Sequence, residues 1–401
     1  MDNLTHSLIG LCLGKSAKSD AKSDRAQNLV AAILSSNIPD VDIFYYGISG
    51  APPVGYLIQH RGYTHTLVAG FALAVICVYL SALICAKPLR WSTKVFFISL
   101  AGVFLHLLFD FFNSYGVHPF WPFHNGWIYG DSLFIIEPMI WFSLLAYAVW
   151  SSERTWSRIT WMIVSFACFF IFWALAPLGL WMKVVLTSIF VFLNGFQAWY
   201  RGSLTMAWSS LIGIVLIFVG SSWVAESKMK KYIETEFSQE SLLQLAQTPF
   251  PANPFCWSNV MVSESEPELY ITRRGTQSLL EPWISCDRSF GPVRQNALQT
   301  PADFTSERPS FDSSIVWDVE HVNSMTGLRD LYFNNCRVQA AMQFYRAPFW
   351  TEDFMDDLRF IRDDRPSFAR LSLKDKDCPV WLTPWKPPLH IVLKPNVIFD
   401  H

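Results

Sequence analysis

The sequence contains few charged residues and no excess of either sign. Asp, Glu, Lys and Arg make up 16% of the 401 residues, and the formal net charge is −2 at pH 7. Proteins that bind nucleic acid usually carry a strongly basic surface, so no nucleic-acid partner is expected. A basic, cleavable N-terminal signal is also not expected, because the chain opens with MDNLTH and its first apolar stretch is short.

Hydrophobic residues are abundant instead, at 51% of the chain, and they are concentrated before about Glu226. Several apolar runs there approach the roughly 20 residues that a helix needs to cross the hydrocarbon core of a membrane. Two shorter apolar segments precede them, one ending near Gly14 and one from Asn28 to Ile38, and predict a short helical hairpin that enters the membrane. The predicted spans are residues 64–86, 95–112, 133–150, 159–180, 184–200 and 207–225.

We therefore predict an α-helical polytopic membrane domain over residues 1–225, followed by a soluble, mostly β domain over residues 226–401. Strand-like runs separated by Pro and other turn residues support the second part of this prediction. These runs are residues 269–272, 314–319, 338–345 and 390–393. The soluble domain also contains Cys256, Cys286, Cys336 and Cys378. Four cysteines in an exported domain permit two disulfides in any of three pairings, and four buried thiols are the alternative.

The distribution of basic residues predicts the orientation of the chain. Lysines and arginines cluster in residues 15–25 and 87–94, at Arg154 and Arg158, and at Arg201. Alternating crossings put all of them on one side, which the positive-inside rule identifies as the cytoplasm. Residues 226–401 then lie on the outer side, which is the periplasm if the protein belongs to a bacterial inner membrane.

Two residues that can bind a metal interrupt the second predicted span. His106 and Asp110 lie four residues apart, so a helix presents both on one face. An aspartate near the centre of a spanning helix costs roughly 2.5–3.5 kcal/mol, and less near the ends. A lone histidine would be interpreted as a packing residue. The pair at the end of a span instead indicates a metal site.

Five more residues of the same types fall on the outer side in this topology. They are His6, Asp40, Asp42, His60 and His65. Imidazoles and carboxylates are ligands of zinc and related divalent ions, and seven of them exceed the needs of one tetrahedral ion. We therefore predict two divalent ions, zinc or alternatively manganese, bridged by Asp40 or Asp42. The ordinary interpretations are an interfacial His6, a helix cap at one of the two aspartates, and a surface or supporting His60.

Other polar residues near these ligands are weaker candidates for function. Arg61 lies between two predicted ligands and would stabilise charge on a phosphoryl oxygen, although it could equally anchor to lipid headgroups. Asp131, at the entry to the third predicted span, is the second candidate catalytic residue. Glu137 lies inside an apolar run, and His118 and His124 are interpreted as surface or interfacial residues.

Taken together, the motifs resemble one family. They are Asp2-x-x-Thr5-His6-x-x-x-Gly10, Pro39-Asp40-x-Asp42, His60-Arg61-x-x-Thr64-His65, and His106-x-x-x-Asp110 followed by Tyr115-Gly116. This set resembles the YdjM/YfhP-type membrane-bound metal-dependent hydrolases over roughly residues 1–225. The family is similar, distantly, to zinc-dependent phospholipase C, whose site is built from His and Asp on helices.

The resemblance also covers Tyr129-Gly130-Asp131, but Glu137 stands where an aspartate is expected. The amino-terminal tryptophan that binds metal in secreted phospholipases C has no counterpart here. The resemblance implies a metal-dependent hydrolase. With ligands at the span ends, where lipid headgroups lie, we expect a phosphoester of a lipid or lipid-linked molecule as substrate. The alternatives are a metal-handling or transport protein that uses the same residues as a binding or transit site, and a scaffold whose soluble domain does the work.

Overall fold

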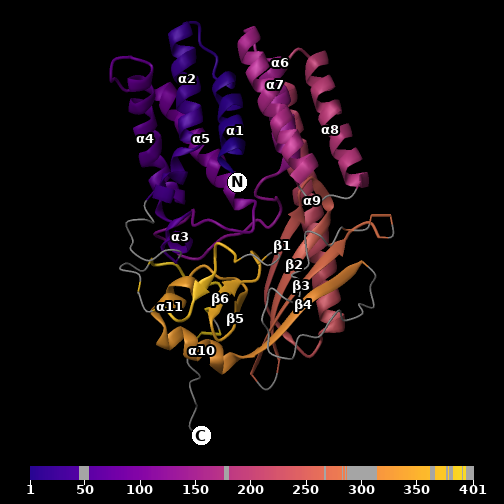
Figure 1. The fold of residues 1–401 in the computed structure, drawn as a ribbon. Helices are drawn as coiled ribbons and strands as arrows, with labels where there is room; N and C mark the ends of the chain where they lie inside the picture. The colour runs from indigo at the N-terminus through magenta and orange to yellow at the C-terminus, as the bar shows by residue number, and fades with distance from the viewer. Residues whose placement is uncertain are drawn as a thin grey trace.

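The structure is a computed structural model in which a helical bundle stands on a β-containing region (Figure 1). It describes residues 1–44, 54–175, 180–265, 268–281, 283, 284, 286, 314–361, 366–375, 378, 383–390, 392 and 393. The helices of the bundle are α1 Asn3–Ser16, α2 Lys22–Ser35, α4 Leu67–Ile84, α5 Thr93–Phe111, α6 Pro138–Trp150, α7 Thr155–Phe170, α8 Leu180–Trp199 and α9 Leu204–Glu236. A π-helical segment, Ile171–Leu175, extends α7.

The predicted fold class is confirmed. Five helical stretches of the described residues are long and apolar enough to cross a membrane, and they are α4, α5, α7 with its extension to Ala174, α8 and α9. The third predicted span, residues 133–150, is shorter than expected, because helix α6 begins only at Pro138. Pro138 lacks a backbone N–H and its ring clashes with a preceding helical turn, so proline is tolerated at the first position of a helix but not inside it. The Glu137 side chain caps α6 by accepting a hydrogen bond from the Met139 amide.

The predicted hairpin is formed by α1 and α2, which pack closely against α5. The Asp2 carboxylate caps α1 by accepting hydrogen bonds from the amides of Leu4 and Thr5, each 3.0 Å long. Glycine allows the close approach of the helices, because a Cβ added to Gly10 would lie 2.9 Å from the Ala32 carbonyl oxygen of α2. The hairpin therefore brings the start of the chain into the bundle.

Short elements connect the membrane helices at the end of the bundle that faces the β region. They are the 3₁₀ segment η1 Ile38–Phe44, helix α3 Val54–Gln59 and the 3₁₀ turn η2 Tyr63–His65. The basic loops between α1 and α2, α4 and α5, α6 and α7, and α8 and α9 lie at the opposite end (Figure 1). The two ends of the bundle therefore differ in charge.

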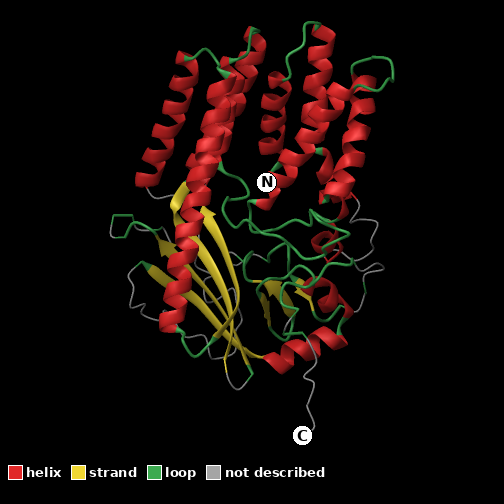
Figure 2. Ribbon diagram, turned by 180° about the vertical axis from the view of Figure 1, so that it is seen from behind, coloured by secondary structure: helices red, strands yellow, loops and turns green. Residues whose placement is uncertain are grey.

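The β region begins with a four-stranded antiparallel sheet whose strands follow the chain order. Its strands are β1 Ser241–Phe250, β2 Asn253–Ser265, β3 Leu269–Ser278 and β4 Ile315–Ser324. Helix α9 continues beyond the predicted span and packs along the sheet (Figure 2), with Met229 and Ile233 against Met261 and Trp317. The predicted boundary between the domains, after residue 225, thus falls inside one continuous helix.

The chain then forms α10 Met325–Asn334, α11 Cys336–Met342 and a small antiparallel sheet of β5 Pro348–Trp350, β6 Phe354–Asp357 and β7 Leu371–Ser372. The predicted strands 269–272 and 314–319 largely lie in β3 and β4. The predicted strand 338–345 is wrong, because Asn335 caps helix α11 by accepting hydrogen bonds from the amides of Arg337 and Val338. Residues 390, 392 and 393 lie in turns, and residue 391 is outside the described residues.

One hydrophobic core joins the end of the bundle to the β region. It contains Leu57 and Ile58 of α3 and Tyr115 from the loop after α5, together with Phe344 and Trp385 of the C-terminal part. The Trp385 indole donates a 2.8 Å hydrogen bond to the Ile58 carbonyl. The connecting loops of the membrane domain are therefore folded as part of the β region.

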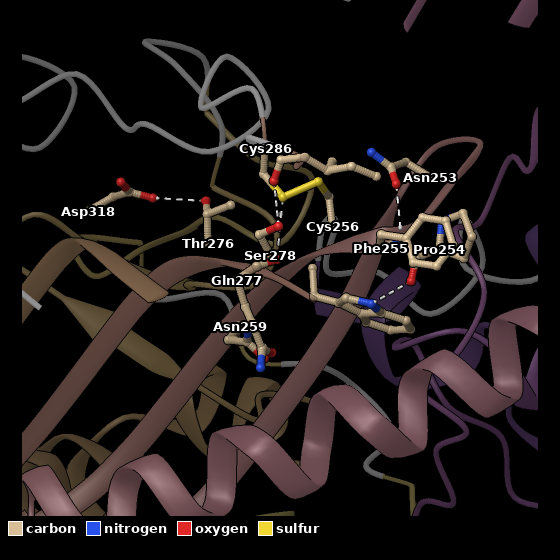
Figure 3. Close-up of a disulfide and its surroundings, with 12 residues drawn as sticks. Asn253, Pro254, Phe255, Cys256, Asn259, Thr276, Gln277, Ser278, Cys286 and Asp318 are labelled. Atoms are coloured by element: carbon tan, nitrogen blue, oxygen red, sulfur yellow. Dashed lines mark hydrogen bonds between the residues drawn. A yellow bond between two sulfur atoms is a disulfide. The ribbon is translucent and has the colours of Figure 1, made fainter. Parts of the chain in front are cut away.

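Two disulfides bond the four cysteines of the C-terminal part, and the pairings are Cys256–Cys286 and Cys336–Cys378. Figure 3 shows the first, which attaches the segment after β3 to the start of β2. Beside it, the Ser278 hydroxyl donates a 2.6 Å hydrogen bond to the Ile284 carbonyl. The two disulfides hold segments that follow the regular strands and helices.

Candidate metal centre

All seven predicted ligands lie at the end of the bundle that faces the β region, and all are buried. Helix α1 carries His6, and η1 carries Asp40 and Asp42. His60 follows α3, His65 closes η2, and His106 and Asp110 occupy the last turns of α5. Residues from five elements thus converge on one place.

The first group consists of four residues whose donor atoms lie within 4.8 Å of one another: Asp40, His65, His106 and Asp110. The Nε2 atoms of His65 and His106 are 3.1 Å apart. Asp110 Oδ2 lies 3.1 Å from the first and 3.4 Å from the second. Asp40 Oδ1 lies 3.5 and 3.6 Å from the same two nitrogens. The four side chains therefore present their donor atoms to a common point.

In His65 and His106, the ring nitrogen remote from the common point, Nδ1, makes hydrogen bonds. These bonds determine that Nε2 faces the point. His106 Nδ1 donates to the Ser36 carbonyl over 2.8 Å, and a carbonyl can only accept. His65 Nδ1 lies 3.0 Å from the Thr64 hydroxyl and 3.3 Å from Asp42 Oδ2. Both Nε2 atoms then offer lone pairs to the common point, which is the arrangement typical of metal-binding histidines.

The second group contains Asp40, Asp42 and His60, whose donor atoms also lie within 4.8 Å of one another. His60 Nδ1 is 2.9 Å from Asp42 Oδ1. The Thr64 hydroxyl donates to Asp42 Oδ2 over 2.7 Å. Asp40 belongs to both groups, so of the two predicted bridging residues the geometry favours Asp40.

The two aspartates of η1 are held in the ionised form. Burial alone would raise the pKa of each carboxyl, since it disfavours the charged form. The neighbouring imidazoles of His106 and His65 nevertheless bring the pKa of Asp40 below its ordinary value. Hydrogen bonds from His60 and His65 lower that of Asp42. Both side chains are therefore carboxylates, the form that binds a cation.

His6 lies at the edge of the first group. Its Nε2 is 3.2 Å from Asp110 Oδ1, and its ring stacks on that of His106 with centroids 3.9 Å apart. His6 Nδ1 has no hydrogen-bond partner among the described residues. The amino group of Met1 contacts the same Asp110 oxygen as His6, although the sequence predicted no counterpart to the amino-terminal ligand of secreted phospholipases C.

Arg61 is the buried cation of the site. Its guanidinium lies 3.0 Å from Asp110 Oδ1 and donates to Asn113 Oδ1 over 2.8 Å. Its backbone amide donates to Asp42 Oδ2 over 2.9 Å, with the residue in the left-handed region at φ 59°. The side chain is only 2% exposed. Arg61 thus contacts ligands of both groups and is fixed in position.

The donor set fits a divalent cation. Three buried carboxylates, those of Asp40, Asp42 and Asp110, lie close together, and among the described residues Arg61 brings one guanidinium to them. An uncompensated buried charge is costly, and a metal ion would remove the imbalance. Imidazole nitrogen and carboxylate oxygen are ligands for zinc, and carboxylates also suit manganese.

Asp131, the second candidate catalytic residue, lies in neither ligand group. Both of its carboxylate oxygens accept hydrogen bonds from Arg346, over 2.7 and 2.8 Å. Glu137 is also directed elsewhere, since its carboxylate accepts from the amides of Met139 and Ala252. These two acidic residues connect the membrane domain to the β region.

Three residues of the site were missed from sequence. Asn113 holds Arg61, Thr64 holds Asp42, and His118 is buried rather than interfacial. The His118 ring lies between Trp127 and Trp385, with centroids at 3.8 and 3.9 Å, and its Nδ1 is 3.3 Å from the Arg61 carbonyl. Thr64 is part of the quoted motif, but no pattern in the sequence distinguishes Asn113 or His118.

The chain is similar to known proteins over its N-terminal part. Residues 1–179, which include all seven ligands, match the family described as YdjM inner membrane protein. The uncharacterized protein YfhP of Bacillus subtilis is 31% identical over 156 residues, which are 37% of this chain and 46% of YfhP. The inner membrane protein YbcI of Escherichia coli is 33% identical over 79 residues, 19% of this chain and 42% of YbcI. The chain thus spans less than half of each relative, and no solved structure matches it.

Proposed function

We propose that this chain, a multi-pass membrane protein related to the YdjM inner membrane protein family over residues 1–179, is a metal-dependent hydrolase of phosphoesters. The observation that carries the proposal is the pair of buried ligand groups that share Asp40, with the Arg61 guanidinium beside them. A carboxylate shared between two metal ions is the usual arrangement in enzymes that hydrolyse phosphoesters.

Two divalent ions, zinc or alternatively manganese, would be held by the two groups. His65, His106 and Asp110, with His6 beside them, would hold one ion, and Asp42 and His60 the other, with Asp40 common to both. Such a pair lowers the pKa of bound water, and so supplies hydroxide near neutral pH, and it neutralises charge on phosphoryl oxygens.

The side chains around the ligands prepare the site. The Ser36 carbonyl and the Thr64 hydroxyl orient His106 and His65. Arg61, held by Asn113 and Asp110, would stabilise the negative charge that develops on a phosphoryl oxygen. Asp131, paired with Arg346, has a structural role in this proposal.

The position of the site supports a membrane substrate. The ligands lie where the membrane helices end, and lipid headgroups would lie near such ends, which favours a phosphoester of a lipid or lipid-linked molecule. The basic loops lie at the opposite end of the bundle, and the β region carries two disulfides, which form in oxidising compartments. Both features favour an inner membrane location with the site on the periplasmic side.

Metal content tests the proposal first. We expect about two zinc or manganese ions per chain in detergent-purified protein by elemental mass spectrometry, and far fewer in the His106→Ala/Asp110→Ala variant. The matched control is His124→Ala, which removes an exposed histidine outside the cluster. The same preparations are then tested for release of phosphate or phosphoalcohol from phospholipids and lipid phosphates.

Three outcomes separate the alternatives. Metal bound by the wild type, together with hydrolysis that is lost in the double variant, supports the hydrolase. Metal binding with no hydrolysis of any phosphoester favours the metal-handling alternative. A wild-type protein that retains no metal after supplementation overturns the proposed function.

A further inference from the structure

A cavity of about 500 Å³ lies between the end of the bundle and the four-stranded sheet. His60 and Arg61 of the candidate metal centre line it on one side. Thr248 of β1, Ser258 of β2 and Arg274 of β3 line it on the other. The cavity is thus a direct extension of the metal centre, and the C-terminal region supplies part of its wall.

The membrane side of the wall carries hydrogen-bond donors without acceptors. Arg61, Asn113 and Tyr115 all line the cavity. Arg61 Nε, Asn113 Nδ2 and Tyr115 Oη are buried and have no hydrogen-bond partner among the described residues. Unpaired buried donors are rare in folded proteins, because each loses its bonds to water. All three belong to side chains that line one cavity, so an occupant that accepts hydrogen bonds would satisfy them after small shifts of these side chains.

The orientation of the Asn113 amide is fixed by its neighbours. Its Oδ1 accepts hydrogen bonds from Arg61 and from the Tyr115 amide, over 2.8 and 2.9 Å. The Nδ2 group is therefore the donor that remains. Tyr115 lies against Arg61, whose guanidinium carbon is 4.8 Å from the centre of the tyrosine ring. The three donors accordingly belong to one contiguous patch of the wall.

The charge of the wall favours an anion. Arg61, Arg274 and Arg359 line the cavity, and none of the described residues that line it is Asp or Glu. Arg359 is held from behind by Asp357, with Nη2 2.8 Å from Oδ2. Arg359 also donates to the Ser114 carbonyl, which ties it to the loop after α5. Guanidinium groups therefore stand on both sides of the cavity, where each can also contact an anionic group of an occupant.

The remainder of the wall is apolar. Phe134, Ile135 and Ile136, which precede α6, line the cavity together with Phe250 and Phe360 of the C-terminal region. Ile135 is 40% exposed, so this apolar part reaches the protein surface at the end of the bundle. The wall thus combines a basic, donor-rich part beside the candidate metal centre with an apolar part next to the start of α6.

We propose that this cavity binds an amphiphile with a phosphate head, and that Asn113 and Tyr115 donate hydrogen bonds to the phosphate oxygens. The apolar chain lies along Phe134–Ile136, and the C-terminal sheet closes the site over the head. This inference rests on the proposed function in that the bound head is the group that would be hydrolysed. It adds two substrate-binding residues and gives the C-terminal region a role in selecting the substrate.

Binding of a phosphonate that resists hydrolysis tests the inference apart from catalysis. The purified full chain in a neutral maltoside detergent is titrated with dodecylphosphonate by calorimetry, and with inorganic phosphate as the head alone. Tyr115→Phe removes one donor, and we expect the dissociation constant to rise roughly tenfold. The matched control is Tyr129→Phe, because the Tyr129 hydroxyl is also buried and unpaired among the described residues but does not line the cavity.

A second variant tests the sheet side of the cavity. Ser258→Trp places a large side chain in the cavity from β2, and we expect it to abolish binding. Ser241→Trp, at an exposed position of β1, is its control. If Ser258→Trp does not fold, Tyr115→Phe still decides the test. Weakened binding in both variants with unchanged controls supports the inference.

The contrary results are equally specific. Equal binding in all variants, or no binding to a wild type that holds its metal, overturns this inference and leaves the proposed function standing. Inorganic phosphate that binds as tightly as the phosphonate identifies free phosphate as the ligand and overturns the amphiphile. A wild type that retains no metal after supplementation but still binds the phosphonate through Tyr115 overturns the proposed function alone.

Discussion

Asp131 and Arg346 form a bidentate ion pair between residues 215 positions apart, with N–O distances of 2.7 and 2.8 Å. Asp131 belongs to the loop that leads into α6, and Arg346 follows α11. The arginine is buried, and its guanidinium carbon also lies 3.9 Å from the centre of the Tyr129 ring. This pair fastens the membrane domain to the C-terminal region.

Asp131→Asn should therefore destabilise the protein. Removal of one partner leaves Arg346 as an uncompensated buried charge, which costs about 3 kcal/mol. We expect a lower thermal unfolding midpoint of the detergent-solubilised full chain, followed by tryptophan fluorescence. Lys374→Ala removes the exposed pair with Asp353 and should leave the midpoint unchanged. If the two variants unfold alike, the Asp131–Arg346 pair does not hold the two parts together.

Arg61→Lys tests the role of the guanidinium in the proposed reaction. Lysine keeps the charge but cannot reproduce the planar contacts with Asp110 and Asn113. We expect kcat for a phosphoester to fall about 100-fold while the metal content stays that of the wild type. Steady-state kinetics and elemental analysis of the same sample check this. A loss of metal instead would show that Arg61 acts by holding the ligand Asp110.

His321 should make the C-terminal region sensitive to acid. Burial in β4 lowers the pKa of His321 from 6.5 to about 4. The folded state then keeps the imidazole neutral while the unfolded chain takes up a proton, so stability falls as the pH decreases from about 6.5 to about 4. The full effect amounts to about 3 kcal/mol. We expect the unfolding midpoint of His321→Gln to depend less on pH in this interval than that of the wild type or of the exposed-histidine variant His124→Gln.

Cysteine labelling in intact cells tests the orientation. Ser19→Cys lies in the basic loop between α1 and α2, and Ser241→Cys lies at the start of β1, where the side chain is exposed. We expect a membrane-impermeant maleimide to label the second variant without permeabilisation and the first only after it. The reverse pattern would place the metal centre on the cytoplasmic side.

The sequence predicted those parts of the site that depend on local spacing. His106 and Asp110 lie four residues apart, so any helix brings them to one face, and the structure has them on α5. The basic loops marked one end of the bundle, and the predicted ligands lie at the other end. Composition alone also separated the apolar helices from the β region.

Contacts distant in sequence were not predictable. The carboxylate of Asp131 has its partner 215 residues away, and no local pattern indicates Arg346. The length of α6 was misjudged for a related reason. Residues 134–136 are apolar because they line a cavity and not because they are helical in lipid, and hydrophobicity does not distinguish the two environments.

Helix α9 passes without interruption from the bundle to the sheet. This continuity fixes how far the sheet is rotated about the helix axis relative to the bundle. Each residue of an α-helix turns the chain by about 100°. One residue inserted after Ala225 would swing the sheet around the helix axis by that angle and carry Arg346 and the cavity wall away from the loops of the bundle. The length of α9 is thus as strictly determined as the identity of the candidate metal ligands, because it sets the angle at which the C-terminal region faces the site.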